Sequence, residues 1–82
     1  MDDWLATMAG KLGVDPLEDG QIAELLDVAR DVAHGVERKM TPLASYLLGA
    51  AVQRRIGHGF TSEEAFDAAV TELRSILPSP DV

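Results

Sequence analysis

One cluster of ionisable residues has a spacing that would bring its side chains together. Arg30, His34 and Arg38 recur at intervals of four, with Asp27 and Asp31 three or four positions from them. On a helix, residues three or four apart share a face. The arginines would hold an anionic group there while His34 donates a hydrogen bond or a proton near neutral pH. The same spacing also suits a solvated face of exposed ion pairs, each worth about 0.3 kcal/mol.

A second basic group falls at the end of the third predicted helix. Arg54, Arg55 and His58 lie close together in the sequence. Positive side chains near a helix C-terminus complement the negative end of its dipole, which explains them structurally. The same group would also suit an acidic partner or a nucleotide phosphate, so it forms a secondary candidate site.

These residues give little support for a catalytic site or a metal site. The chain has no cysteine, which excludes thiolate ligands and thiol nucleophiles. His34 and Asp31 would need a further ligand, and His58 falls in a distant loop. The hydroxyl residues are explained as caps or packing residues, and the carboxylate pairs sit at predicted helix starts, where the dipole favours them. We therefore predict no metal site, no cofactor and no enzymatic activity.

Length and charge narrow the classes of protein further. The chain has 82 residues, with 14 acidic against 7 basic side chains and a formal charge of −7. It has room for one core, and its field repels the phosphates of nucleic acid. Its longest apolar run, from Tyr46 to Val52, is far shorter than the ~20 residues that span a bilayer. We predict a soluble cytoplasmic protein that binds neither nucleic acid nor membrane.

Apolar residues at helical spacing predict four helices and no strand. The predicted helices cover 2–12, about 20–38, 43–56 after a Thr41-Pro42 start, and a last segment from 62 to about 77. Gly13 followed by Val14 fits a Schellman ending, and Thr61 with Glu64 fits a capping box. The fold class is all-α, a small four-helix bundle-like domain over residues 1–78 with a frayed tail at 79–82.

The third predicted helix is apolar on nearly every side. This pattern favours the central helix of the bundle, with one face of an oligomer interface as the alternative. On the first interpretation Leu47 is buried, and Leu47→Asp unfolds the domain by burying an unpaired charge. Trp4, at helical spacing with Leu5 and Met8, is expected at the edge of the core.

A family resemblance rests on three segments of the sequence. They are the run 25–38 (LLDVARDVAHGVER), the Thr-Pro-Leu at 41–43 and the Tyr-Leu-Leu-Gly at 46–49. With these segments the chain resembles a small bacterial helical domain family. Its members occur as stand-alone short proteins or fused C-terminal to a molybdenum cofactor guanylyltransferase, the enzyme that joins GMP to molybdopterin. The resemblance implies association with such an enzyme and transfers no catalytic residue.

Three functions follow from these observations as hypotheses. The first is a non-enzymatic accessory or interaction module, linked to molybdenum cofactor guanylylation through a protein partner such as the guanylyltransferase. The second is a small-ligand binding protein in which Arg30, His34 and Arg38 grip the phosphate of a nucleotide or pterin. The third is a homodimeric structural protein. Direct binding of a nucleotide or pterin separates the first two, and the mass in solution tests the third.

Overall fold

A computed structural model describes the backbone of residues 2–78 and the side chains of residues 4–78. It contains four helices, α1 (Asp2–Leu12), α2 (Asp19–Gly35), α3 (Met40–Gly57) and α4 (Ser62–Ser75). The predicted all-α class is therefore confirmed. The tail predicted at 79–82 lies outside the described residues.

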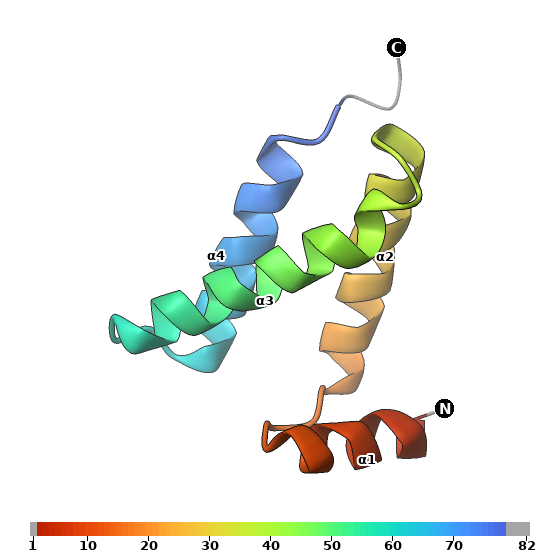
Figure 1. Cartoon of the computed structure of the whole chain (residues 1–82). Helices are drawn as coiled ribbons and strands as arrows, with labels where there is room; N and C mark the ends of the chain where they lie inside the picture. The colour runs from red at the N-terminus through yellow and green to blue at the C-terminus, as the bar shows by residue number, and fades with distance from the viewer. Residues whose placement is uncertain (1, 79–82) are drawn as a thin grey trace.

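The centre of the fold is α3, which packs against both α4 and α2. Figure 1 shows α3 crossing in front of these two helices, with α1 set apart below them. The buried core cluster comes from α2, α3 and α4 and consists of Val28, Val32, Leu48, Ala69 and Val70. The prediction of α3 as the central helix is confirmed, and α1 contributes nothing to this cluster.

Small side chains set how closely the three helices approach one another. Ala65 and Ala69 of α4 are almost fully buried, while Phe66 is only partly buried against the core. Because alanine occupies these contact positions, the helices pack closely around a thin core. No large side chain among the described residues is completely buried. Much of the chain's apolar surface is therefore left outside.

Two helix ends follow the sequence signals closely. Gly13 has a φ of 74°, and the N–H groups of Gly13 and Val14 donate to the carbonyls of Gly10 and Ala9, which is the Schellman arrangement. At α4, Thr61 Oγ1 accepts from the Glu64 N–H at 3.1 Å and Glu64 Oε1 accepts from the Thr61 N–H at 3.0 Å. The predicted ending of α1 and the capping box of α4 are both confirmed.

The boundary between α2 and α3 differs from the prediction. We expected α2 to continue to about Arg38, but it ends at Gly35, since Val36 leaves helical geometry with φ −116° and ψ −85°. α3 begins at Met40, before the predicted cap. Instead of capping, Thr41 Oγ1 donates to the Ala29 carbonyl of α2 at 3.4 Å. Tertiary contact thus replaced the local cap that the sequence suggested.

One arginine forms ion pairs between α2 and α4. Arg74 of α4 donates to Asp31 at 2.8 Å and to Glu24 at 3.2 Å, both on α2. Glu24 and Asp31 are seven residues apart, so they project from the same side of α2 two turns apart. The hydrogen bond to Asp31 raises the pKa of the Arg74 guanidinium, which stays charged at any physiological pH.

Two predictions of burial are wrong. Leu47 is 67% exposed although the adjacent Leu48 is only 7% exposed, and Trp4 of α1 is also 67% exposed. Successive residues of a helix point about 100° apart, so a helix that is apolar all round cannot bury every leucine between two neighbours. Trp4 is exposed because α1 takes no part in the main packing. Leu47→Asp therefore has no buried charge to create in the isolated chain.

The two adjacent leucines provide a first test of the fold. We predict that Leu48→Ala lowers the free energy of unfolding by about 2–4 kcal/mol, because it opens a cavity between α2, α3 and α4. Leu47→Ala should change it by less than about 0.5 kcal/mol in dilute solution. Urea denaturation followed by circular dichroism measures both. Equal losses at the two positions would contradict the orientation of α3.

Arg74 provides a second test. Arg74→Ala should lower the free energy of unfolding by about 1 kcal/mol, since it leaves Glu24 and Asp31 on α2 without their shared cation. The control is Arg30→Ala, which removes a pair within one exposed helix and should cost about 0.3 kcal/mol. Urea titration at low salt compares the two. A smaller loss of unfolding free energy for Arg74→Ala than for Arg30→Ala would show that the Arg74 bridge does not stabilise the fold.

Candidate functional site

The predicted stripe on α2 is divided by the structure. Arg30 donates to Asp27 one turn earlier, and both side chains are exposed. Asp31 instead binds Arg74 of α4. Arg38 follows the end of the helix, in the α2–α3 connection. The five residues therefore do not form one site, and Asp31 holds the fold together.

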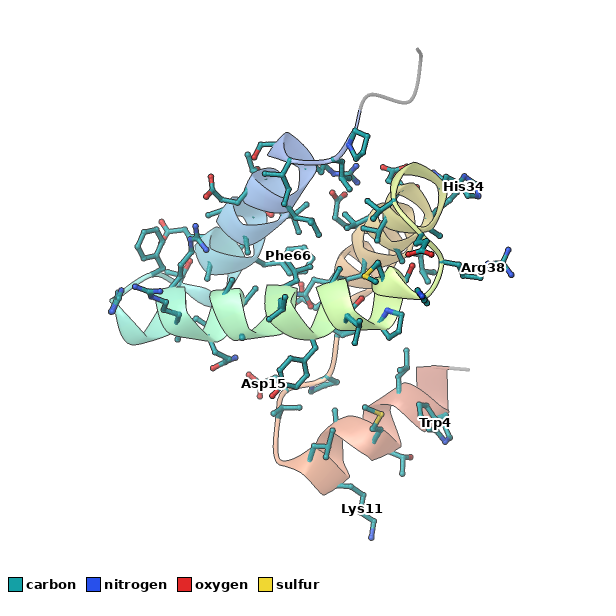
Figure 2. The ribbon with its side chains drawn as sticks, turned by 45° about the horizontal axis from the view of Figure 1, so that its top comes forward. Trp4, Lys11, Asp15, His34, Arg38 and Phe66 are labelled. Carbon is teal, nitrogen blue, oxygen red and sulfur yellow. The ribbon has the colours of Figure 1, made fainter. Side chains whose placement is uncertain are left out.

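What remains of the stripe is a basic corner formed by His34 and Arg38. Figure 2 shows both side chains directed outward on the same side of the molecule. The exposed Val36 lies between them in the sequence. The predicted stripe required a helix up to Arg38, and α2 stops at Gly35, one turn after Asp31. The corner is an open surface, suited to contacts with another protein.

The secondary basic group gains a neighbour that the sequence analysis did not include. Arg54, Arg55 and His58 line a shallow pocket of about 540 Å³ together with Phe60. Phe60 is brought back beside α3 because Gly59, with a φ of 100°, turns the chain and the Phe60 N–H donates to the Arg55 carbonyl. A positive rim beside an aromatic ring suits a planar anion, although the C-terminus of α3 opposes one.

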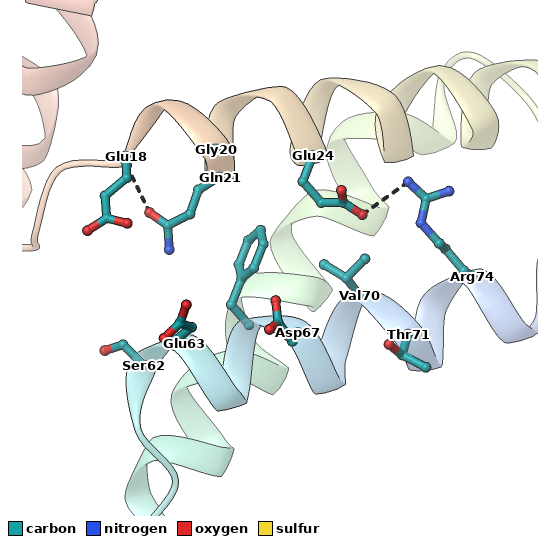
Figure 3. A pocket seen from close by; sticks show the side chains of 11 residues that line it. Glu18, Gly20, Gln21, Glu24, Ser62, Glu63, Asp67, Val70, Thr71 and Arg74 are labelled. Atoms are coloured by element: carbon teal, nitrogen blue, oxygen red, sulfur yellow. Dashed lines mark hydrogen bonds and ion pairs between the residues drawn. The ribbon is translucent and has the colours of Figure 1, made fainter.

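A larger cleft of about 700 Å³ lies between α2 and α4 (Figure 3). Its walls carry Glu18, Glu24, Glu63 and Asp67, with Arg74 at one end. The cleft was not predicted because its two walls are far apart in the chain. Structural roles account for several of these charges, since Glu24 binds Arg74 and Glu63 lies in the first turn of α4, where the dipole favours it.

Two apolar faces lie on the outside of the molecule, one on α3, where an oligomer interface was the alternative prediction, and one on α1. The outer stripe of α3 consists of Leu43, Tyr46, Leu47 and Ala50, all exposed. The α1 face consists of Trp4, Met8 and Leu12, also exposed. Both sets recur at three or four residues, which places each along one side of its helix. Each helix thus has an apolar side that the described fold leaves uncovered.

Charge is distributed unevenly around the outer stripe. α3 contains no acidic residue, although the chain has 14 acidic residues in all. Arg38 and Lys39 precede α3, and Arg54 and Arg55 lie in its last turn. Among the side chains described, no ion pair involves Arg38, Arg54 or Arg55. Because acids outnumber bases two to one, cations left unpaired at both ends of one helix are a specific feature of this surface.

Comparison with known proteins gives a family without a described activity. The model of a domain of unknown function (DUF6457) matches residues 1–80. The chain belongs to this family. No curated protein and no solved structure matches it. The DUF6457 match agrees with the resemblance to a small helical domain family, while the link to molybdenum cofactor guanylylation is left as a hypothesis.

Two further observations concern the described residues alone. None of their helices is long and apolar enough to cross a membrane. No group of three or more His, Cys, Asp or Glu side chains within this part of the chain is placed to hold a metal ion. The candidate surfaces for binding another molecule are the basic corner, the pocket beside Phe60 and the two apolar faces.

The basic corner yields a prediction about stability. His34→Ala should change the free energy of unfolding by less than about 0.5 kcal/mol, because His34 is exposed at the end of α2. Thermal and urea unfolding of the two chains would measure the difference. A loss of several kcal/mol would mean that His34 belongs to the fold and not to a free surface.

Proposed function

We propose that this chain is a non-catalytic interaction module, which associates with proteins through the surfaces of α1, α3 and the α2–α3 connection. The carrying observation is the exposure of six large apolar side chains on two helices: Trp4, Met8, Leu12, Leu43, Tyr46 and Leu47. Large contiguous apolar surface on a small protein is typical of interaction sites. Aromatic side chains such as Trp4 and Tyr46 are also enriched where proteins bind one another.

The composition of α3 supports the same function. Interface centres are depleted in charge, with arginine and aromatic residues enriched relative to other surfaces. The outer stripe has Tyr46 among aliphatic residues, no acidic residue anywhere on α3 and Arg54 at its end. A helix whose only task was to face water would carry mixed charges on that side, as the outer face of α2 does with Asp27 and Arg30.

The candidate enzyme partner is a molybdenum cofactor guanylyltransferase. The support is the resemblance to domains that are fused C-terminal to this enzyme. We place its contact at the basic corner, because Arg38 has no ion pair among the described side chains and His34 extends beside it.

A second candidate function is binding of a nucleotide or pterin phosphate. The specific observation in its favour is the pocket of Arg54, Arg55, His58 and Phe60, in which two arginines and an aromatic ring line one hollow. The stripe first considered for such a ligand is less suitable, since Arg30 is neutralised by Asp27 and Asp31 by Arg74. Binding here would make the chain a ligand carrier and not an accessory of an enzyme.

An NMR titration of the labelled chain tests these functions. With the guanylyltransferase, we expect amide shifts around His34 and Arg38. Arg38→Glu should weaken the complex about tenfold, equivalent to ~1.4 kcal/mol. The matched control is Lys11→Glu, which makes the same change of charge at the far side of the molecule and should leave the affinity unchanged (Figure 2).

Separate additions of GTP and molybdopterin complete the titration. Shifts confined to Arg54, His58 and Phe60 on adding a small molecule would favour the ligand-binding function. Equal effects of Arg38→Glu and Lys11→Glu would remove the basic corner as the contact. A chain that associates neither with the enzyme nor with any protein, itself included, would contradict the interaction module as a whole.

A further inference from the structure

A hollow of about 410 Å³ lies where the α1–α2 connection, residues 13–18, runs past α2, α3 and the start of α4. The connection reaches this position because Gly13, with a φ of 74°, turns the chain after α1. The lining is mainly apolar and includes Val14, Leu17, Leu25, Leu48, Val52 and Ile56. Sites for small molecules in proteins are concave, mostly apolar and roughly 300–1,000 Å³ in volume. The hollow therefore has the size and the lining of a small-molecule site.

Small residues on α3 keep the hollow open. Ser45 and Gly49 lie one turn apart on the side of α3 that lines it, and both are exposed. A Cβ atom added at Gly49 would meet no atom within 4 Å beyond its chain neighbours and the backbone of its own helix. Glycine inside a helix is destabilising relative to alanine, and no close contact at Gly49 requires it. What Gly49 contributes is the open space beside it.

The hollow adjoins the cleft between α2 and α4. The residues that line both spaces are Glu18, Gln21, Ser62 and Phe66. The hollow and the cleft therefore meet at the starts of α2 and α4. Figure 3 shows Glu18 at the start of α2 across the cleft from Glu63 of α4. An apolar space thus continues directly into a space with carboxylates on both walls.

Most of these carboxylates have no cation beside them. Among the residues that line the two spaces, all in the described part of the chain, Arg74 is the one basic side chain. It is already paired with Glu24. No ion pair between described side chains involves Asp15, Glu18 or Glu63. Opposite charges attract most strongly where water is partly excluded, so this junction favours a cation over an anion.

We propose that the hollow binds a small organic cation, an apolar ring or chain that has a protonated amine. The apolar body lies beside Gly49 on α3, and the amine lies where the hollow meets the cleft, between Glu18 and Glu63. Phe66 lines both spaces, and an aromatic ring attracts an ammonium group. This binding goes beyond the interaction module, and its ligand is opposite in charge to the phosphates considered for the pocket beside Phe60.

An NMR titration of the labelled full chain with four probes tests the proposal. 1-Naphthylmethylamine has both the ring and the amine, and we expect it to shift the amides of Leu17, Gly49 and Gln53. Butylamine has the cation without the ring, and 1-naphthylmethanol has the ring without the cation. Each should bind at least about tenfold more weakly. 1-Naphthylacetate should shift none of these amides, because its carboxylate would lie against Glu18.

Gly49→Leu tests the hollow itself. The added side chain occupies the open space, so the affinity for 1-naphthylmethylamine should fall at least about tenfold. The matched control is Gly10→Leu, because a Cβ at Gly10 in α1 also has no neighbour within 4 Å and Gly10 lines neither space. This variant should bind the probe as the unaltered chain does. Circular dichroism establishes that both variants keep their helices.

The double variant Glu18→Gln/Glu63→Gln tests the contacts of the amine. It should lower the affinity for 1-naphthylmethylamine about tenfold and leave the affinity for 1-naphthylmethanol unchanged, because only the amine is charged. The matched control is Asp19→Asn/Glu72→Gln. It removes two carboxylates that line neither space, and it should leave both affinities unchanged.

Three results would overturn the proposal. The first is the absence of amide shifts with 1-naphthylmethylamine. The second is equal affinity for this amine and for 1-naphthylmethanol, which would show that the hollow does not select a cation. The third is equal affinity for 1-naphthylmethylamine and butylamine, which would show that the cleft alone accepts any cation, such as a lysine of a partner. The interaction module would stand in each case, because the α1 face and the outer stripe of α3 line neither space.

Discussion

The position of α3 between α2 and α4 is the constraint on which the rest of the molecule depends. One helix can turn only part of its surface toward two neighbours, and α3 uses that part for Ala44, Leu48, Ala51 and Val52. Small residues on α4 let the helices approach closely, which completes the core without large side chains. The bulkier residues of α3 then have no place inside, and Leu43, Tyr46 and Leu47 become surface.

Ion pairs at the surface stabilise the same arrangement of helices. Beside the apolar core, Arg74 of α4 joins the two helices by binding two carboxylates on α2. This use of acidic residues explains why a stripe that looks continuous in the sequence is not a site. It also leaves Arg38 and Arg54 without ion pairs among the described side chains, at the two ends of the helix that lacks acids. The carboxylates of α2 thus stabilise the fold, whereas the ends of α3, which have unpaired arginines, are open to binding.

Local signals in the sequence predicted the helices well, but not which of their residues contact other helices. The glycine and hydroxyl signals at Gly13 and Thr61 act within a few residues, so the end of α1 and the start of α4 were predictable. The end of α2 was not, because Thr41 makes a contact with Ala29 that depends on tertiary packing. Periodicity identified which residues of α3 are apolar. It does not say which of two apolar sides faces the core, so Leu47 and Leu48 were not distinguished.

The candidate site shows the same limit at a larger scale. Arg30, His34 and Arg38 have the spacing of one helical face, yet the pairing of Asp31 with Arg74 joins residues more than forty positions apart. A sequence pattern describes neighbours along one helix, whereas a binding surface is made by what several helices leave uncovered. For this chain that remainder is apolar and flanked by arginines.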